Sequence, residues 1–127
     1  MIKILVLDDE VGTCEQLGDF FRYRGYKVFG ATSGEEAISI LKKEKPQIYF
    51  LDIKMPEING IDVLREAKKQ DPRSKVIMIT AIRDEDQKAE ALRLGADEYV
   101  LKPFSYENIE NLIIRMINEV LSDEEKA

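Results

Sequence analysis

The stretch Ile48-Tyr49-Phe50-Leu51-Asp52-Ile53-Lys54-Met55-Pro56 indicates the fold of this chain most clearly. Its first four residues form an unbroken apolar run, which predicts a strand buried on both faces, as in a parallel sheet. The run ends at a carboxylate, Asp52, and turn-forming residues follow. Open α/β sheets bind their ligands just outside the carboxyl ends of their strands, so Asp52 is a candidate functional residue.

Three other apolar runs, at 4–7, 76–79 and 99–101, also end in polar side chains. The carboxyl ends of parallel strands meet at one edge of a sheet, so we expect the residues that follow the four runs to converge. These residues are Asp8, Asp9, Asp52, Thr80 and Lys102.

The apolar pattern alternates between strand-like and helical segments along the whole chain. We predict strands at 2–7, 26–31, 48–52, 75–80 and 97–101, and helices at about 11–24, 34–45, 61–70, 84–94 and 106–121. Five strand–helix units predict an α/β fold, with a parallel sheet between two layers of helices. Residues 1–122 should form one domain, and 123–127 a frayed acidic tail.

Three of the predicted helices carry apolar residues that we expect to face the core. In the first helix the stripe begins at Val11, and in the last helix it runs from Ile109 to Leu121. The helix at 84–94 is more polar, and its expected inward residues are Ala89, Leu92 and, just beyond it, Ala96. Because so little of it is apolar, this helix should be the least firmly anchored.

Composition excludes several classes of function. The net charge of −6 argues against direct nucleic-acid binding, and the absence of histidine removes Ser-His-Asp catalysis and histidine-ligated zinc. The single cysteine, Cys14, rules out an internal disulfide and fits a reducing compartment. No apolar run approaches the roughly 20 residues of a membrane span, and no leader precedes the first predicted strand. We therefore expect a cytoplasmic protein with no membrane partner.

The converging residues suit phosphoryl transfer. Three neighbouring carboxylates repel one another unless a cation lies between them, and oxygen ligands suit Mg²⁺. An aspartate nucleophile, a metal, a lysine and a hydroxyl can together form and stabilise an aspartyl phosphate. Each residue alone has a simpler explanation, as a helix cap, a turn residue, a loop cap or a solvated lysine. Their shared position at strand ends favours a common site.

The chain resembles the receiver domain of two-component response regulators over nearly its whole length. The motifs that carry the resemblance are Val6-Leu7-Asp8-Asp9-Glu10, Asp52-Ile53-Lys54-Met55-Pro56-Glu57-Ile58-Asn59-Gly60, Thr80-Ala81, Gly95-Ala96-Asp97-Glu98-Tyr99 and Lys102-Pro103-Phe104. The resemblance implies a flavodoxin-like (βα)5 three-layer sandwich with strand order 2-1-3-4-5. It also implies a phosphoaccepting signalling switch rather than an enzyme, one that assists its own phosphorylation and dephosphorylation.

The resemblance also implies a role for each acidic residue. Asp52 would accept a phosphoryl group from a sensor histidine kinase or a histidine phosphotransfer protein. Asp9 and Asp52 would bind Mg²⁺, or Mn²⁺, directly with the backbone carbonyl of Lys54, while Asp8 would act through water. Gly60 would supply the turn after the active-site loop.

The remaining implied roles concern the phosphate and the switch. Lys102 would pair with a phosphoryl oxygen, and the backbone of Lys54 and Ala81 would bind the phosphate. Thr80 would move to hydrogen-bond the phosphate, and Tyr99 would turn inward behind it. The Lys102-Pro103 bond would be cis.

The partner is expected on the face built from the helix at 84–94, the strand at 97–101 and the last helix. Its expected exposed or switching members are Ile82, Lys88, Ala91, Tyr99 and Tyr106.

Three alternative functions share either the fold or the aspartate and magnesium chemistry. A flavin-binding flavodoxin would need a hydroxyl- and glycine-rich loop where this chain has Asp8-Asp9-Glu10, and a haloacid-dehalogenase-type phosphatase would need an aspartate at Lys54. The main alternative is an interaction domain with the receiver fold that works without phosphorylation. We expect the domain to act either as a stand-alone regulator on a downstream protein target or through a C-terminal effector in a longer chain, and the tail favours the stand-alone regulator. The domain is expected to be a monomer or a phosphorylation-dependent dimer.

Overall fold

Ten elements alternate along the chain in a computed structural model that describes residues 1–54 and 57–126. The strands are β1 (Lys3–Leu7), β2 (Lys27–Ala31), β3 (Ile48–Asp52), β4 (Lys75–Thr80) and β5 (Glu98–Leu101). The helices are α1 (Val11–Tyr23), α2 (Gly34–Glu44), α3 (Gly60–Gln70), α4 (Glu85–Arg93) and α5 (Tyr106–Lys126). Met55 and Pro56, which belong to the predicted active-site turn, and Ala127 lie outside the described residues.

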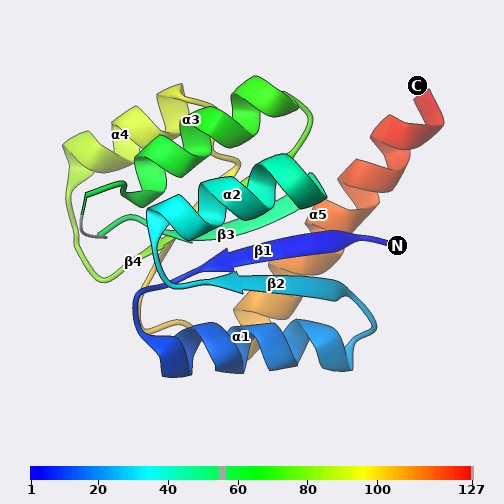
Figure 1. Cartoon of the computed structure of the whole chain (residues 1–127), viewed down its shortest axis with the longest axis horizontal. Coiled ribbons are helices and arrows are strands. Elements are labelled where there is room, and N and C mark those ends of the chain that lie inside the picture. Colours follow the sequence, from blue (N-terminus) through cyan, green and yellow to red (C-terminus); the bar gives the residue numbers. More distant parts are fainter. Residues whose placement is uncertain (55–56, 127) are drawn as a thin grey trace.

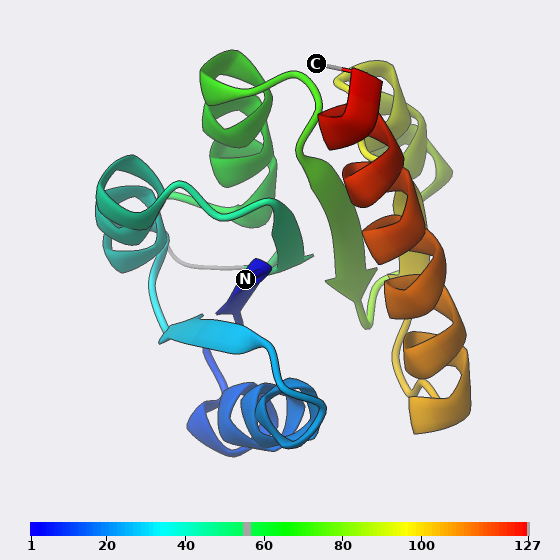
Figure 2. The same ribbon diagram turned by 90° about the vertical axis from the view of Figure 1, so that its right-hand side faces the viewer.

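The five strands form one parallel sheet in the order β2-β1-β3-β4-β5. Helices cover both faces of the sheet, and the arrangement of layers can be followed in Figure 1 and, after a quarter turn, in Figure 2. The predicted flavodoxin-like three-layer fold and its strand order are therefore confirmed. None of the helices in the described part of the chain is both long enough and apolar enough to cross a membrane.

The apolar run of β3 is explained by two separate cores. Successive strand residues point to opposite faces of a sheet. Tyr49 and Leu51 pack into the core beneath α2, α3 and α4, whereas Ile48 and Phe50 pack into the core beneath α1 and α5. A strand at the centre of such a sheet needs apolar residues at every position, and this places Asp52 at the end of a rigid element.

Cys14 is buried in the core beneath α1. Its thiol lies 3.7 Å from the carbonyl oxygens of Val6 and Ala31, to which it can donate a hydrogen bond. Burial raises the pKa of this thiol above its ordinary value. Cys14 is thus a small core residue.

The last helix is longer than the sequence predicts. We expected it to end near residue 121 and 123–127 to be frayed, but α5 continues to Lys126. The ammonium group of Lys75, at the start of β4, lies 3.3 Å from the carboxylate of Glu119 and 3.9 Å from that of Asp123. These ion pairs fasten the last turns to the sheet, and no glycine or proline follows Pro103 to end the helix.

The inward face of α4 also differs from the prediction. Ala96 is buried as expected, but Leu92 is 44% exposed and Ala89 is exposed as well. Ala91, which we expected among the exposed or switching residues, is fully buried. In a short polar helix the few apolar residues do not define a stripe, so their spacing gave the wrong orientation. Two residues at the ends of the other predicted stripes are likewise exposed, Val11 and Leu121.

Candidate functional site

The structure brings the predicted polar residues together at one edge of the sheet. Asp8 follows β1, Asp52 and Thr80 end β3 and β4, and Lys102 follows β5. The parallel register aligns these strand ends. At this edge of the sheet lies a cavity of about 480 Å³, lined by Asp9, Glu10, Asp52, Lys54, Ala81, Ile82 and Lys102.

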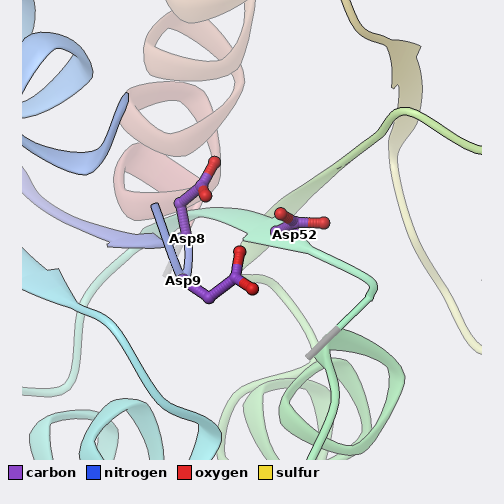
Figure 3. A group of neighbouring side chains, drawn as sticks. All are labelled: Asp8, Asp9 and Asp52. Atoms are coloured by element: carbon purple, nitrogen blue, oxygen red, sulfur yellow. The ribbon is translucent and has the colours of Figure 1, made fainter. Parts of the chain in front are cut away.

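Three carboxylates form the acidic side of this cavity. Asp8, Asp9 and Asp52 each offer an oxygen within 4.8 Å of the other two, and Figure 3 shows them converging from the ends of β1 and β3. Asp8 and Asp52 are buried, whereas Asp9 is exposed. An oxygen-only ligand set that is partly open to solvent suits a hard cation such as Mg²⁺, which keeps several waters.

Lys102 holds the two buried carboxylates together. Its Nζ donates to Oδ2 of Asp8 at 2.8 Å and to Oδ2 of Asp52 at 3.2 Å. The other oxygen of Asp8 accepts a hydrogen bond from the backbone N–H of Glu10 at 2.9 Å. The other oxygen of Asp52 accepts from the backbone N–H of Lys54 at 3.2 Å. Both oxygens of Asp8 are therefore already bonded within the protein.

Burial and these ion pairs have opposing effects on the titration of Asp52 and Lys102. Burial raises the pKa of the Asp52 carboxyl, and although the Lys102 ammonium opposes this, the net shift is upward. Burial lowers the pKa of Lys102, but the hydrogen bonds and charges of Asp8 and Asp52 outweigh it and raise the pKa overall. Lys102 therefore stays charged beside a carboxylate that is less well solvated than usual.

Thr80 is fully buried at the end of β4. Its Oγ1 accepts a hydrogen bond from the backbone N–H of Ile82 at 3.2 Å, so the hydroxyl caps its own loop. Tyr99 lies outside the cavity lining, on β5 beside Met78 of β4. The structure thus places the two predicted switch residues on neighbouring strands.

The loop after β3 is shaped by a close approach of the backbone at Gly60. We expected Gly60 to supply a turn, but it is the first residue of α3, where Asn59 and Asp62 form a capping box. A side chain on Gly60 would collide with the carbonyl oxygen of Asp52. Glu57, in the described part of this loop, has a positive φ of 61°.

Two contributors near the cavity were not identified from the sequence. A side chain on Gly34 would collide with the backbone of Ile58, so this glycine lets α2 approach the active-site loop. Glu10 lines the cavity and donates its backbone N–H to Asp8. No sequence signal marks Gly34, while Glu10 follows the Asp8-Asp9 pair directly.

The Lys102-Pro103 bond is cis, as the resemblance implied.

Residues 4–114 match the family model of the response regulator receiver domain. The chain belongs to this family. Response regulator SaeR of Staphylococcus aureus is 44% identical over 120 residues, which are 91% of this chain and 52% of SaeR. The receiver domain described here thus spans about half the length of the curated relatives it matches. It is the receiver domain of a two-component response regulator.

Solved receiver structures show the same fold as this receiver domain. A receiver domain protein from Clostridium thermocellum superposes with a TM-score of 0.86 at 31% identity and covers 100% of both chains. The structure of the CheX-CheY-BeF3-Mg²⁺ complex from Borrelia burgdorferi contains a chain with a TM-score of 0.83 and 30% identity, covering 91% of this chain and 89% of that one.

Proposed function

We propose that this receiver domain accepts a phosphoryl group on Asp52, from a phosphohistidine of a cytoplasmic sensor kinase or a phosphotransfer protein. The observation that carries the proposal is the position of Asp52, which lines a cavity together with Asp9 and Lys102 and lies within 4.8 Å of the Asp9 carboxylate and 3.2 Å of the Lys102 ammonium. Receiver-family membership supports the same chemistry.

The arrangement of the acidic side chains fits a divalent cation. Asp9 and Asp52 line the cavity, whereas Asp8 does not, and both oxygens of Asp8 are occupied by Lys102 and by the N–H of Glu10. We infer that Asp9, Asp52 and the backbone carbonyl of Lys54 bind the ion directly and that Asp8 acts through water. Mg²⁺, or Mn²⁺ in the same ligands, would neutralise charge on the transferred group.

Asp52 then acts as the nucleophile. One carboxylate oxygen attacks the phosphorus of the phosphohistidine, the P–N bond breaks, and the imidazole nitrogen of the donor leaves and takes up a proton. Lys102 exchanges its contact with Asp52 for a phosphoryl oxygen and keeps its bond to Asp8. The backbone N–H of Ala81 binds another phosphoryl oxygen, and the N–H of Lys54 exchanges its bond to Asp52 for a phosphoryl oxygen.

The phosphoryl group gives Thr80 a new acceptor. Its hydroxyl would leave the Ile82 N–H and donate to a phosphoryl oxygen, which favours one of two arrangements of the β4–α4 loop. Tyr99 would respond on the neighbouring strand. The face formed by α4, β5 and α5 would then bind a protein target, a second receiver domain or an attached effector.

Labelling with acetyl phosphate tests the proposal. The wild-type chain should acquire a base-labile phosphoryl group in the presence of Mg²⁺ but not after chelation. Asp52→Asn should lose this label, because an amide is a poor nucleophile. Asp86→Asn, which changes an exposed carboxyl outside the cavity, should label like the wild type. Wild-type labelling of Asp52→Asn would overturn the proposal, and partner binding without any labelling would favour the interaction-domain alternative.

Calorimetry separates the roles of the two neighbouring aspartates. Asp9→Asn should weaken Mg²⁺ binding more than Asp8→Asn. The Asp8 carboxylate is hydrogen-bonded to Lys102 and to the N–H of Glu10, whereas the Asp9 carboxylate has no hydrogen bond to the described residues and is free to bind the ion. The reverse order would show that Asp8 is the direct ligand. A matched NaCl titration controls for ionic strength.

A further inference from the structure

The two ends of α4 are held very differently. Its N-terminal end consists of Asp84, Glu85 and Asp86, which are exposed and form no ion pair with the described residues. Its C-terminal end leads directly into a group of hydrogen bonds that joins α3, β4 and β5. This asymmetry determines which part of the helix can move at low cost.

Asp97, just before β5, is the centre of that group. Its Oδ2 accepts from the backbone N–H of Val76 at 2.8 Å and from Nζ of Lys68 at 3.1 Å. Its own N–H donates to the carbonyl of Val76 at 2.8 Å, and Lys68 also donates to the carbonyl of Ser74. The side chains of Lys68 and Asp97 are only 17% and 24% exposed, so solvent screens this pair less than a surface pair. We call these four residues the α4 anchor.

The helix is joined closely to the α4 anchor. Gly95, with a φ of +104°, ends α4, and the N–H groups of Gly95 and Ala96 donate to the carbonyls of Leu92 and Ala91. A Cβ atom on Gly95 would lie 3.4 Å from the aliphatic stem of Lys68, so this stem lies beside the end of the helix. One turn earlier, an ion pair of 3.1 Å joins Glu90 to Arg65 of α3. The C-terminal half of α4 thus has several bonds to lose if it moves.

The N-terminal half covers polar atoms that are poorly satisfied. The side-chain oxygen of Gln87 and the hydroxyl of Tyr99 are buried, and neither has a hydrogen-bond partner among the described residues. A buried polar atom without a partner destabilises the arrangement that contains it. This half of the helix can therefore gain hydrogen bonds by moving, while the anchored half cannot.

We propose that Lys68 and Asp97 are positioning residues that fix the C-terminal end of α4, so that the helix switches by rotating about Gly95. A helix of 9 residues is about 13 Å long, and a tilt of about 10° moves its first residue by about 2 Å while its last turn stays in place. That this rotation follows phosphorylation rests on the function proposed above. The existence of the α4 anchor does not.

Amide hydrogen exchange of the ligand-free chain, followed by NMR, tests the α4 anchor. The amides of Gly95, Ala96 and Asp97 should exchange more slowly than those of Gln87 and Lys88. Lys68→Met should speed exchange at 95–97 about tenfold, because it removes two charge-assisted hydrogen bonds, and should change 87–88 less than about twofold.

Two further variants complete the comparison. Lys69→Met removes a neighbouring exposed lysine that forms no ion pair with the described residues, and should leave both sets of amides unchanged. Asp97→Asn keeps an oxygen for the Val76 N–H but loses the charge, and should speed exchange at 95–97 even if Lys68→Met fails to fold. No change at 95–97 in either variant, or an equal change along the whole helix, would overturn the α4 anchor.

The same measurement with Mg²⁺ and beryllofluoride tests the rotation. Exchange in the wild type should change at 87–88 and stay constant at 95–97, whereas in Lys68→Met the change should spread to 95–97. Equal changes at both ends of α4 in the wild type would overturn the rotation. If the signals of Asp52, Lys54 and Ala81 do not respond at all, the proposed phosphorylation fails, and the ligand-free comparison still decides the α4 anchor.

Discussion

β3 and β5 carry two different kinds of functional residue in one sheet. All residues of β3 are buried, and the strand has a neighbour on each side. All residues of β5 are half-exposed, and the strand forms an edge of the sheet. β3 holds Asp52, which must keep its position relative to Lys102 and the other carboxylates. β5 holds Tyr99, which would have to move in the proposed switch. Rigidity and mobility are therefore distributed by position in the sheet.

The largest expected loss of stability comes from truncating an apolar side chain of β3, and the same change in β5 serves as the comparison. Ile48→Ala removes a fully buried side chain of β3 and should lower the free energy of unfolding by about 3 kcal/mol. Val100→Ala removes a half-exposed side chain of β5 and should lower it by about 1 kcal/mol. Urea unfolding measures both. Equal losses would show that β5 is packed as firmly as β3, which would remove the contrast.

Alanine substitutions at two glycines test how closely the backbone approaches the end of β3. Gly60→Ala should destabilise the fold by about 2 kcal/mol and reduce phosphorylation, because the new side chain pushes against the carbonyl of Asp52. Gly12→Ala is the matched control, since nothing lies within 4 Å of the new side chain in α1, and it should stabilise by up to about 1 kcal/mol. Thermal unfolding and acetyl phosphate labelling measure both effects. A neutral Gly60→Ala would contradict the close approach.

The pH dependence of stability tests the burial of Asp52. Because the pKa of Asp52 is raised, the folded protein binds this proton more tightly than the unfolded chain, and this contribution is lost as the pH rises through the raised pKa. Asp52→Asn does not titrate there. Without divalent cations, the free energy of unfolding of Asp52→Asn should equal that of the wild type at low pH. At pH 7 it should exceed the wild-type value by roughly 1 kcal/mol, because only the wild type has lost this contribution.

Lower stability of Asp52→Asn at pH 7 would mean that the ion pair with Lys102 outweighs burial. Asp86→Asn, at an exposed carboxyl, controls for the loss of one negative charge.

The smallest expected effect is at α4. Leu92→Ala should change the free energy of unfolding by less than about 0.5 kcal/mol, because Leu92 is 44% exposed. Leu94→Ala should lower it by about 1 kcal/mol, because Leu94 packs against the core beneath α4. The reverse order would restore the orientation of α4 that the sequence predicts. Chemical unfolding of both variants under identical conditions measures the two changes in the free energy of unfolding.

The strand pattern was predictable because buried central strands need apolar residues at every position. The convergence of Asp52 with Asp8, Asp9 and Lys102 followed from the parallel topology alone. Contacts that depend on three-dimensional packing were not predictable. The pairing of Lys102 with Asp8 and the ion pairs of Lys75 with α5 join residues far apart in the sequence. The collision that excludes a side chain at Gly60 depends on the path of the loop that returns this residue to Asp52.

The burial of Cys14 has a practical consequence for observing the switch. Thiol reagents attack the thiolate, and here the thiol is only 7% exposed and has a raised pKa, so maleimide dyes and spin labels should leave it unmodified. A cysteine introduced at an exposed position of α4, such as Lys88→Cys, could then be labelled alone in the otherwise natural sequence. Fluorescence anisotropy or electron paramagnetic resonance at that label would report the motion of α4 while Cys14 stays in the core.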